Sequence, residues 1–259
     1  MVQRFLCLKC QKTFSTATTH PCFQQKKRHF NFRILKELCS GVSQRRIARN
    51  LRLNRKTIAR KLIFLGLQAQ SKLNEMNQAL PPAEIVEFDD LETFEHSKCK
   101  PLSVTLCVRK SRWILGFEVS KMPAKGKLAK LSFKKYGPRR DMRNLGRRTL
   151  FSRIRPFIHP NATIKSDQNP HYPAIIKQFF PEAMHEAFKG QRGSIVGQGE
   201  LKKLRFDPLF SLNHTCAMLR ANINRLIRRT WCTTKIPEKL ALHIAIYAVY
   251  HNIHLPNTS

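Results

Sequence analysis

Acidic side chains are scarce in this 259-residue sequence, in which 16 Asp and Glu stand against 48 Lys and Arg for a formal net charge of +32. The basic residues run from position 4 to position 239 and are not confined to one tail. Contact with phosphates releases counterions, so such a charge indicates a polyanionic partner. A hydrophobic content of 42% is compatible with a folded core and argues against full disorder. Composition alone leaves a basic RNA-binding structural protein as an alternative to a DNA-binding one.

Long apolar runs are also missing. No stretch approaches the ~20 residues that a membrane span needs, and "MVQRFLCLKC" lacks the apolar segment of a signal peptide. We therefore expect a cytoplasmic protein, in which the eight cysteines serve as thiols or metal ligands rather than in disulfides. Four of them lie among apolar residues and are predicted to be packing groups: Cys39, Cys107, Cys216 and Cys232.

A second C-x-x-C motif is absent as well. Cys7 and Cys10 form the one such motif, in "RFLCLKCQKTFS", and could present two thiolates to a zinc ion. A closed zinc site needs four ligands, and His20 and Cys22 are the candidates to complete it. Two alternatives stay open: a missing half that lies upstream of Met1, or two ordinary thiols.

The stretch "GVSQRRIARNLRLNRKTIARKLIFLG" has the spacing of a helix-turn-helix. Ser43 and Asn54 are placed to cap two helices, and "NFRILKELCSG" supplies a preceding one. The residues predicted to face inward are Ile47, Ala48, Leu51, Ile58 and Leu62. The basic side chains predicted to contact DNA are Arg45, Arg46, Arg55, Lys56, Arg60 and Lys61. The pattern therefore predicts a helix-turn-helix domain over 29–66, with a helical hairpin bearing a solvated basic face as the alternative.

The sequence pattern changes after the predicted helix-turn-helix. Residues 67–82 are predicted to be a linker or linking helix, because the Pro81-Pro82 pair cannot continue a helix. Three strands are then expected in "AEIVEFDD", "LSVTLCVR" and "RWILGFEVS", joined by turn-sized separators in antiparallel order. "ATIKSD" is a further short strand, and "IPEKLALHIAIYAVYHN" has the spacing of a core helix packed on the sheet. These elements predict an α/β domain over 83–254.

Two of the expected strands end in aspartate, at Asp89 and at Asp167. Strand ends in one sheet can bring such carboxylates to a common edge, where a hard cation such as Mg²⁺ or Mn²⁺ binds oxygen ligands. Turn residues without a ligand are the alternative. A helix is predicted over 207–230, and it places Asn213 and Arg220 two turns apart on one face.

The segment 121–155 is strongly basic and contains a single acid, Asp141. We expect it to contact phosphates, and Phe133 and Tyr136 within it could stack on unpaired bases. A solvated basic loop is the alternative. The arginines predicted to contact DNA here are Arg139, Arg140, Arg147 and Arg148.

Three stretches together carry a family resemblance: "FDDLETF", "KSDQNPHYPAI" and "LNHTCAMLRANINRLIRRT". With the upstream motifs, they make nearly the whole chain resemble bacterial insertion-sequence transposases of the DDE type. The branch in question combines an N-terminal zinc ribbon, a helix-turn-helix and a ribonuclease H-like catalytic domain. The resemblance implies that Asp89 and Asp167 are the first two metal ligands, that Asn213 is the third, and that Arg220 binds DNA. Asparagine departs from the acid of the DDE pattern, although some related elements are similar in using it.

The resemblance further implies a mixed ribonuclease H-like sheet with helices on both faces, and a partial zinc ribbon over 1–28. The expected activity is Mg²⁺- or Mn²⁺-dependent cleavage at terminal inverted repeats, followed by strand transfer to target DNA. Two DNA ends held together imply at least a dimer, acting at the bacterial nucleoid. Alternatives are a catalytically inactive, transposase-derived DNA-binding regulator, or a third metal ligand at Glu186 or Glu200.

Overall fold

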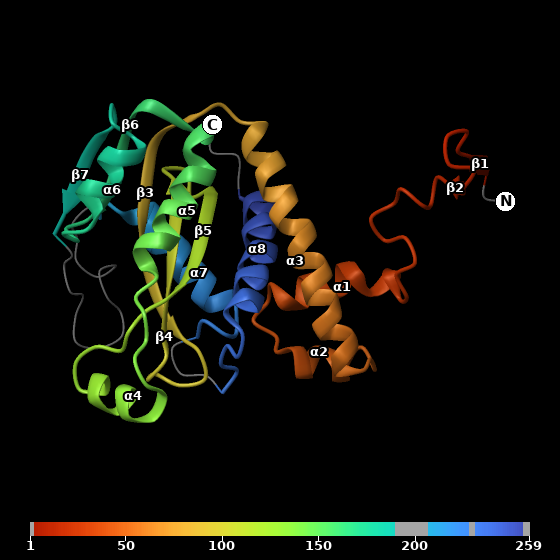
Figure 1. The fold of residues 1–259 in the computed structure, drawn as a ribbon, viewed down its shortest axis with the longest axis horizontal. Helices are drawn as coiled ribbons and strands as arrows, with labels where there is room; N and C mark the ends of the chain where they lie inside the picture. Colours follow the sequence, from red (N-terminus) through yellow and green to blue (C-terminus); the bar gives the residue numbers. More distant parts are fainter. Residues whose placement is uncertain (1–2, 190–206, 228–230, 256–259) are drawn as a thin grey trace.

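The computed structural model describes residues 3–189, 207–227 and 231–255 (Figure 1). The chain starts in a small antiparallel hairpin of β1 (Arg4–Leu6) and β2 (Thr13–Ser15), which Figure 1 shows away from the main body. A short 3-10 turn, Arg28–Phe30, leads from there into the first helices.

Three helices follow, as expected: α1 (Asn31–Leu38), α2 (Gln44–Asn50) and α3 (Arg55–Gln78). The hydroxyl of Ser43 accepts the backbone N–H of Arg46 at 3.2 Å, and the side chain of Asn54 accepts that of Lys56 at 2.8 Å. Both predicted caps are therefore confirmed. The five residues expected to face inward are all buried.

Helix α3 does not stop at the end of the helix-turn-helix. It continues to Gln78, so most of the segment expected as a linker or linking helix is helical. Its second half packs against α8 (Pro237–His254), and Ala69 and Leu73 are buried there. The two helices cross closely at Gly66, where an added Cβ would lie 2.5 Å from Cβ of Leu242.

A five-stranded mixed sheet forms the centre of the molecule, in the order β5-β4-β3-β6-β7. The strands are β3 (Ala83–Phe94), β4 (Pro101–Arg109), β5 (Ile114–Lys121), β6 (Ile158–Asp167) and β7 (Met184–Phe188). The first three are antiparallel neighbours, whereas β6 is parallel to β3 and β7 is parallel to β6. The four strands predicted from sequence are confirmed, and β7 is an addition to them. The expectation that the first strand ends at Asp89 is wrong, because β3 stays paired with β4 as far as Phe94, whereas β6 does end at Asp167.

Helices cover both faces of this sheet (Figure 1). One face packs against α5 (Arg143–Ile154) and α6 (Tyr172–Phe179), around Phe88 and Phe151. The other face shares a core with α1–α3, α8 and α7 (Phe210–Asn222). A further helix, α4 (Leu128–Tyr136), lies at the lower edge in Figure 1. The α/β prediction is confirmed at this level.

The helix expected over 207–230 is shorter than predicted. Helix α7 ends at Asn222, because Ile223 adopts an extended backbone conformation. The side chain of Asn222 donates to the carbonyl of Met218 at 2.9 Å and to the hydroxyl of Tyr247 at 3.1 Å, which fixes the helix end against α8. Arg225 therefore lies beyond the helix, and Arg228 and Arg229 lie outside the described residues. None of the described helices is both long and apolar enough to cross a membrane.

Candidate active site

Asp89 and Asp167 lie side by side on neighbouring strands. Glu87 of β3 is paired with Lys165 of β6 in parallel register, and each aspartate follows two residues later on its own strand. Side chains two residues apart share one face of a sheet, and neighbouring strands lie ~4.8 Å apart. Burial raises the pKa of Asp89 to about 6, and the negative charge of Asp167 adds to this effect. The structure thus brings together the two acids that the sequence singled out.

Asp89 is held in place by two hydrogen bonds to the same carboxylate oxygen. Its Oδ1 accepts the backbone N–H of Asp90 at 2.6 Å and the hydroxyl of Tyr172 at 3.1 Å. Tyr172 is fully buried, and its ring packs on Phe88 with the ring centroids 4.6 Å apart. The tyrosine therefore orients one oxygen of Asp89 and leaves the other for a ligand.

The adjacent acid, Asp90, is neutralised by the protein itself. It accepts the hydroxyl of Thr105 at 2.6 Å and Nη2 of Arg147 at 2.6 Å. Arg147 also lies over the ring of Tyr172, 4.9 Å from its centroid. Asp90 is therefore a structural partner of Arg147, at the border of the acid pair formed by Asp89 and Asp167.

The prediction that Arg147 contacts DNA is wrong. Its side chain is 3% exposed, and it is engaged with Asp90. Residues Leu150, Phe151 and Ile154 follow it at spacings of three, four and seven, which place Arg147 on the buried stripe of α5. That spacing is visible in the sequence and would have identified it as an inward-facing residue.

An open groove of about 540 Å³ adjoins Asp167. Three cationic side chains line it, Lys125, Arg143 and Lys189, together with His171. These cations come from three separate stretches of chain. Lys125 and Arg143 belong to the basic segment 121–155 that is expected to contact phosphates, whereas Lys189 lies outside it and was not predicted. A groove with positive walls beside a carboxylate pair favours an anionic, phosphate-bearing ligand.

The third predicted ligand, Asn213, makes a different contact. It is exposed at the start of α7, and its Nδ2 donates to Oδ2 of Asp207 at 2.9 Å. Within the described part of the chain, no hydrogen bond joins it to Asp89 or Asp167. Whether Asn213 is a metal ligand stays a prediction.

Helix α7 nevertheless faces the acid pair. Buried Glu87 accepts the backbone N–H of Leu212 at 2.9 Å, which ties the first turn of α7 to β3. One turn after Asn213, Cys216 lies close enough to Asp89 for that charge, together with burial as the larger cause, to raise the pKa of the thiol to about 12. Arg220 lies near the same thiol and lowers its pKa in opposition. Sequence reasoning missed Glu87, although an acid inside an apolar strand is a signal that could have found it.

The other third-ligand candidates differ in position. Glu186 on β7 forms an ion pair with Lys165 at 3.5 Å, on the strand next to Asp167. Glu200 lies outside the described residues. No group of three or more His, Cys, Asp or Glu able to hold a metal ion occurs among the residues that the structure describes. A cation at Asp89 and Asp167 would complete its shell with amide, hydroxyl, water or phosphate oxygens, which suit Mg²⁺.

No protein-family model matches this sequence. A search of curated proteins gives no match either.

The N-terminal hairpin places the predicted zinc ligands in two pairs. Hydrogen bonds from the backbone and side chain of Cys10 lower the pKa of Cys7, so these two thiols are close. His20 Nδ1 accepts the backbone N–H of Cys22 at 3.0 Å, and Sγ of Cys22 lies 3.5 Å from Nδ2 of Asn31. The two pairs are not gathered into one cluster in the described chain, and zinc binding stays a prediction.

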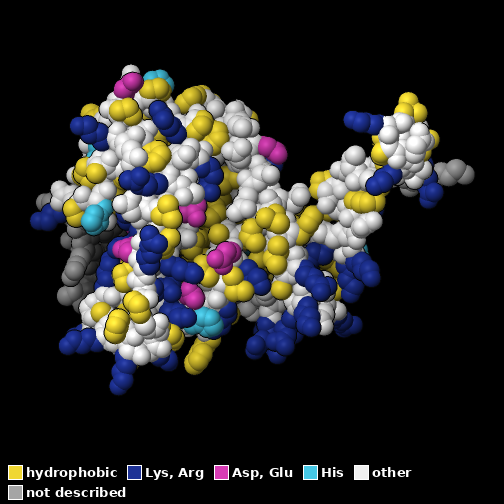
Figure 2. Space-filling view, in the orientation of Figure 1, with side chains coloured by type: hydrophobic (Ala, Val, Ile, Leu, Met, Phe, Trp, Pro, Cys, Tyr) yellow, Lys and Arg dark blue, Asp and Glu magenta, His cyan; other side chains and the backbone are white. Residues whose placement is uncertain are grey.

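The helix-turn-helix presents a basic surface. Arg45, Arg46, Arg55, Lys56 and Arg60 are all exposed. Figure 2 shows dark blue side chains gathered over α2 and the start of α3, at the lower right. This surface has the charge and exposure that phosphate contacts require.

Lys61 is the exception, and the prediction that it contacts DNA is wrong. It is 4% exposed, and its Nζ donates to Oδ1 of Asn31 at 2.7 Å. Burial lowers its pKa, and a nearby Cys22 opposes that effect. Lys61 lies three residues after buried Ile58, so the helical period turns it inward.

The basic segment before α5 divides into anchoring and exposed residues. Arg139 is half-buried, and it donates to the carbonyl of Met122 at 3.0 Å and to Glu95 at 3.2 Å. Arg140 and Arg148 are exposed. Nε of Arg148 donates to Oδ1 of Asn144 at 3.2 Å, and both of these exposed arginines can meet a phosphate from solvent.

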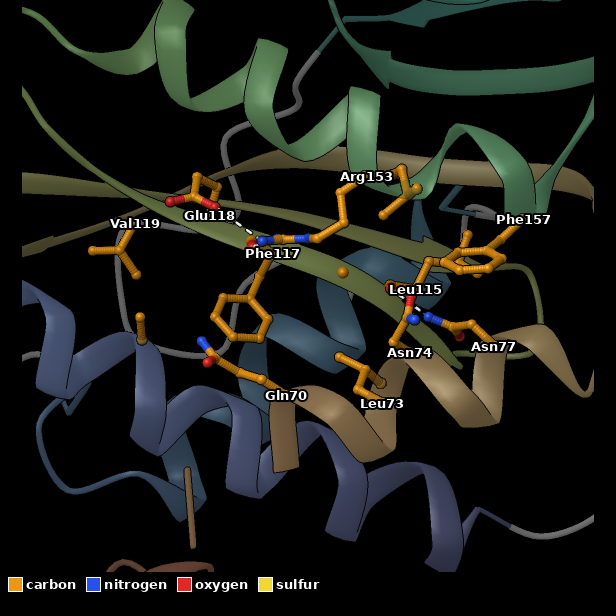
Figure 3. A pocket seen from close by; sticks show the side chains of 13 residues that line it. Gln70, Leu73, Asn74, Asn77, Leu115, Phe117, Glu118, Val119, Arg153 and Phe157 are labelled. Atoms are coloured by element: carbon orange, nitrogen blue, oxygen red, sulfur yellow. Dashed lines mark hydrogen bonds and ion pairs between the residues drawn. The ribbon is translucent and has the colours of Figure 1, made fainter. Parts of the chain in front are cut away.

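A second cavity of about 400 Å³ lies between α3, β5 and α5 (Figure 3). Figure 3 shows Asn74 and Gln70 on one wall and the ion pair of Glu118 and Arg153, at 3.4 Å, on the other. Neither Asp89 nor Asp167 lines it. This cavity is separate from the acid pair and adds nothing to its chemistry.

Proposed function

We propose that this protein is a DNA transposase with a ribonuclease H-like catalytic domain, in which Asp89 and Asp167 support metal-dependent strand cleavage and transfer. The observation that carries the proposal is their position, two residues beyond the paired Glu87 and Lys165 on adjacent parallel strands. The strand order and the helices on both faces agree with the fold that the resemblance implies. The basic helix-turn-helix supports recognition of terminal inverted repeats.

The side chains around the acids fit a divalent cation. Asp89 and Asp167 would hold it through carboxylate oxygens, and when bound it supplies Lewis-acid stabilisation of the charge that develops on a phosphodiester. Tyr172 holds Asp89 in one orientation, so less conformational entropy is lost on binding. Lys189 would bind the phosphates that flank the reacting one, joined by Lys125 and Arg143 as these exchange their ion pairs with Glu92 and Asp141 for phosphate.

The proposed reaction has two steps. Water attacks a phosphodiester at the element end and leaves a 3′-OH on the element and a 5′-phosphate on the flanking strand. The 3′-OH then attacks a phosphodiester of the target DNA and displaces a 3′-OH of the target strand. Asn213 would contribute a neutral amide oxygen after giving up its contact with Asp207, and Arg220 would hold a neighbouring phosphate. Because two DNA ends must be held together, the active form contains at least two copies of the chain.

A second candidate function is DNA binding without chemistry, as in a regulator derived from a transposase. The observation that favours it is the hydrogen bond of Asn213 to Asp207, which leaves the acid pair with two carboxylates and no third partner in the described chain. The same residues would then serve only to bind DNA.

The two functions are separated by incubating the full-length protein with duplexes from the DNA flanking its gene, with Mg²⁺ or Mn²⁺. A transposase nicks at a fixed position near the element end and joins that end to a second duplex. A protein that binds these duplexes but leaves every one intact at all metal concentrations contradicts the proposal and supports the regulator.

A further inference from the structure

Two aromatic side chains are unusually exposed near one end of the sheet. Trp231 is 98% exposed and Phe133 is 66% exposed, whereas large aromatic side chains ordinarily bury most of their surface. They come from segments about a hundred residues apart in the chain, one before α8 and the other on α4. Neither is used by the acid site described above.

Both segments are fastened to the same turn, residues 95–100 between β3 and β4. The backbone N–H of His96 donates to the carbonyl of Thr234 at 2.8 Å, and Glu95 forms a parallel bridge with Thr234. The buried hydroxyl of Ser132 on α4 donates to the carbonyl of Cys99 at 2.6 Å. Figure 1 shows α4 and the foot of the β3–β4 hairpin along the lower edge of the molecule.

A third aromatic ring joins them. The ammonium group of Lys100 lies over the ring of Tyr136 at the end of α4, 4.6 Å from the ring centroid. This contact links the turn and the helix a second time. We call Trp231, Phe133 and Tyr136 the aromatic platform. The segments that carry these rings are attached to a common turn by backbone and buried side-chain bonds, so they stay at the same end of the sheet.

Positive charge surrounds the aromatic platform. Residues 121–140 contain no Asp or Glu, and the acid of the turn, Glu95, is already occupied by Arg139 at 3.2 Å. The exposed cations on the three segments are Lys98, Lys127, Lys130, Lys134, Lys135, Arg140 and Lys235. None of these cations forms an ion pair with a described residue, although Lys135 lies over the ring of Tyr136 at 5.5 Å and Lys235 donates to the hydroxyl of Thr233 at 2.9 Å. Exposed aromatic rings among such cations match a ligand that combines flat apolar faces with closely spaced negative charges.

We propose that the aromatic platform binds single-stranded DNA, with unpaired bases stacked on Trp231 and Phe133 and phosphates held by the surrounding lysines. In a duplex the base faces are covered by their neighbours, so only unpaired bases can stack on protein rings. Stacking does not depend on base identity, and the platform therefore binds strands with little sequence preference. The biological ligand rests on the proposed function, in which it is the strand unpaired near a cleaved element end.

The test uses the full-length protein without divalent cations, so that no cleavage takes place. A 12-nucleotide oligothymidylate and a duplex of equal length are titrated separately while tryptophan fluorescence is followed. The chain has two tryptophans, and Trp113 is half-buried with its indole N–H bonded to Asn77 at 2.9 Å, so it serves as an internal reference. The single strand is expected to quench the fluorescence of Trp231, and Trp231→Phe is expected to lose the quench while keeping most of the affinity.

Trp231→Ala and Phe133→Ala are each expected to weaken single-strand binding about tenfold, ~1.4 kcal/mol, and to leave duplex binding unchanged. Leu131→Ala is the matched control, because Leu131 is 52% exposed on the same helix but has no aromatic face. Binding of the single strand at parental affinity by both alanine variants overturns the proposal. An equal loss in Leu131→Ala also overturns it, and indicates an apolar surface for a protein or a lipid instead. Cleavage is measured separately with metal, so a chain that stacks single strands but never cleaves contradicts only the proposed function.

Discussion

The guanidinium of Arg147 donates a 2.6 Å hydrogen bond to Asp90, although 57 residues separate them in the chain. The ion pair distinguishes Asp90 from Asp89 and Asp167, the two acids proposed to bind a cation. Asp90 is neutralised by Arg147, whereas neither Asp89 nor Asp167 forms an ion pair with a described residue, and burial raises the pKa of both.

We predict that Arg147→Met destabilises the fold by about 3–5 kcal/mol, because it leaves the buried carboxylate of Asp90 without its partner. The double variant Arg147→Met with Asp90→Asn should recover a large part of that loss. Chemical denaturation of the four proteins of this cycle gives the coupling energy. Arg148→Met is the control, because Arg148 is the next residue in the chain and its side chain is exposed. Its free energy of unfolding should change by no more than about 0.5 kcal/mol. Additive single effects would show that the ion pair contributes nothing.

The raised pKa of Asp89 predicts a pH dependence of stability. Its folded value of about 6 lies above its ordinary value of 3.8, so the folded state binds more protons than the unfolded state between these limits. In metal-free protein the contribution of this group to stability therefore falls as pH rises from about 4 to about 6. Asp89→Asn should be more stable than the parent at pH 8 by as much as ~3 kcal/mol, and equal to it below pH 4.

Asp141→Asn serves as the control, because it is expected to change stability in the opposite direction as pH rises. The side-chain hydrogen bond from Arg143 lowers the pKa of Asp141, so this variant should lose stability above the ordinary pKa of aspartate. Melting temperatures at several pH values check both. A stability advantage of Asp89→Asn that is the same at pH 4 and pH 8 would be inconsistent with a buried, charged Asp89.

Gly66 allows the long α3 to cross α8. We predict that Gly66→Ala lowers the free energy of unfolding by about 1–3 kcal/mol, because the new methyl group would meet Cβ and Cα of Leu242, which cannot rotate away. This loss opposes the ~1 kcal/mol that alanine gains over glycine in a helix. Gln70→Ala, on the exposed side of the same helix, is the comparison and should be nearly neutral. A rise in the melting temperature of Gly66→Ala would show that the helices do not cross this closely.

Local features of the fold could be predicted from sequence. Ser43 and Asn54 each accept the backbone N–H bond that their position before a helix indicates. The antiparallel strands and α8 were visible in their periodicity. The parallel addition of β6 and β7 was not, since it depends on contacts between distant segments and β7 is only five residues long.

In the candidate site, too, local features could be predicted from sequence and contacts between distant residues could not. Asp89 and Asp167 were found because each ends a strand-like run. The errors at Lys61 and Arg147 arose where positive charge was given more weight than helical spacing, and that spacing places both among buried residues. The bond from Tyr172 to Asp89 joins residues 83 positions apart, and no local pattern encodes such a contact.

Cleavage of an end-labelled duplex as a function of Mn²⁺ concentration tests the central claim most directly, namely that Asp89 and Asp167 form a metal-dependent catalytic pair. The parent, Asp89→Asn, Asp167→Asn and the control Glu84→Gln, which changes an exposed acid on the same strand as Asp89, are compared, with DNA affinity measured in parallel. We predict that the two pair variants lose cleavage by at least ~100-fold at every Mn²⁺ concentration yet bind DNA as tightly as the parent or more so, because a repulsive carboxylate has been removed. The control should cleave like the parent. Parental cleavage by either Asp89→Asn or Asp167→Asn would contradict the account.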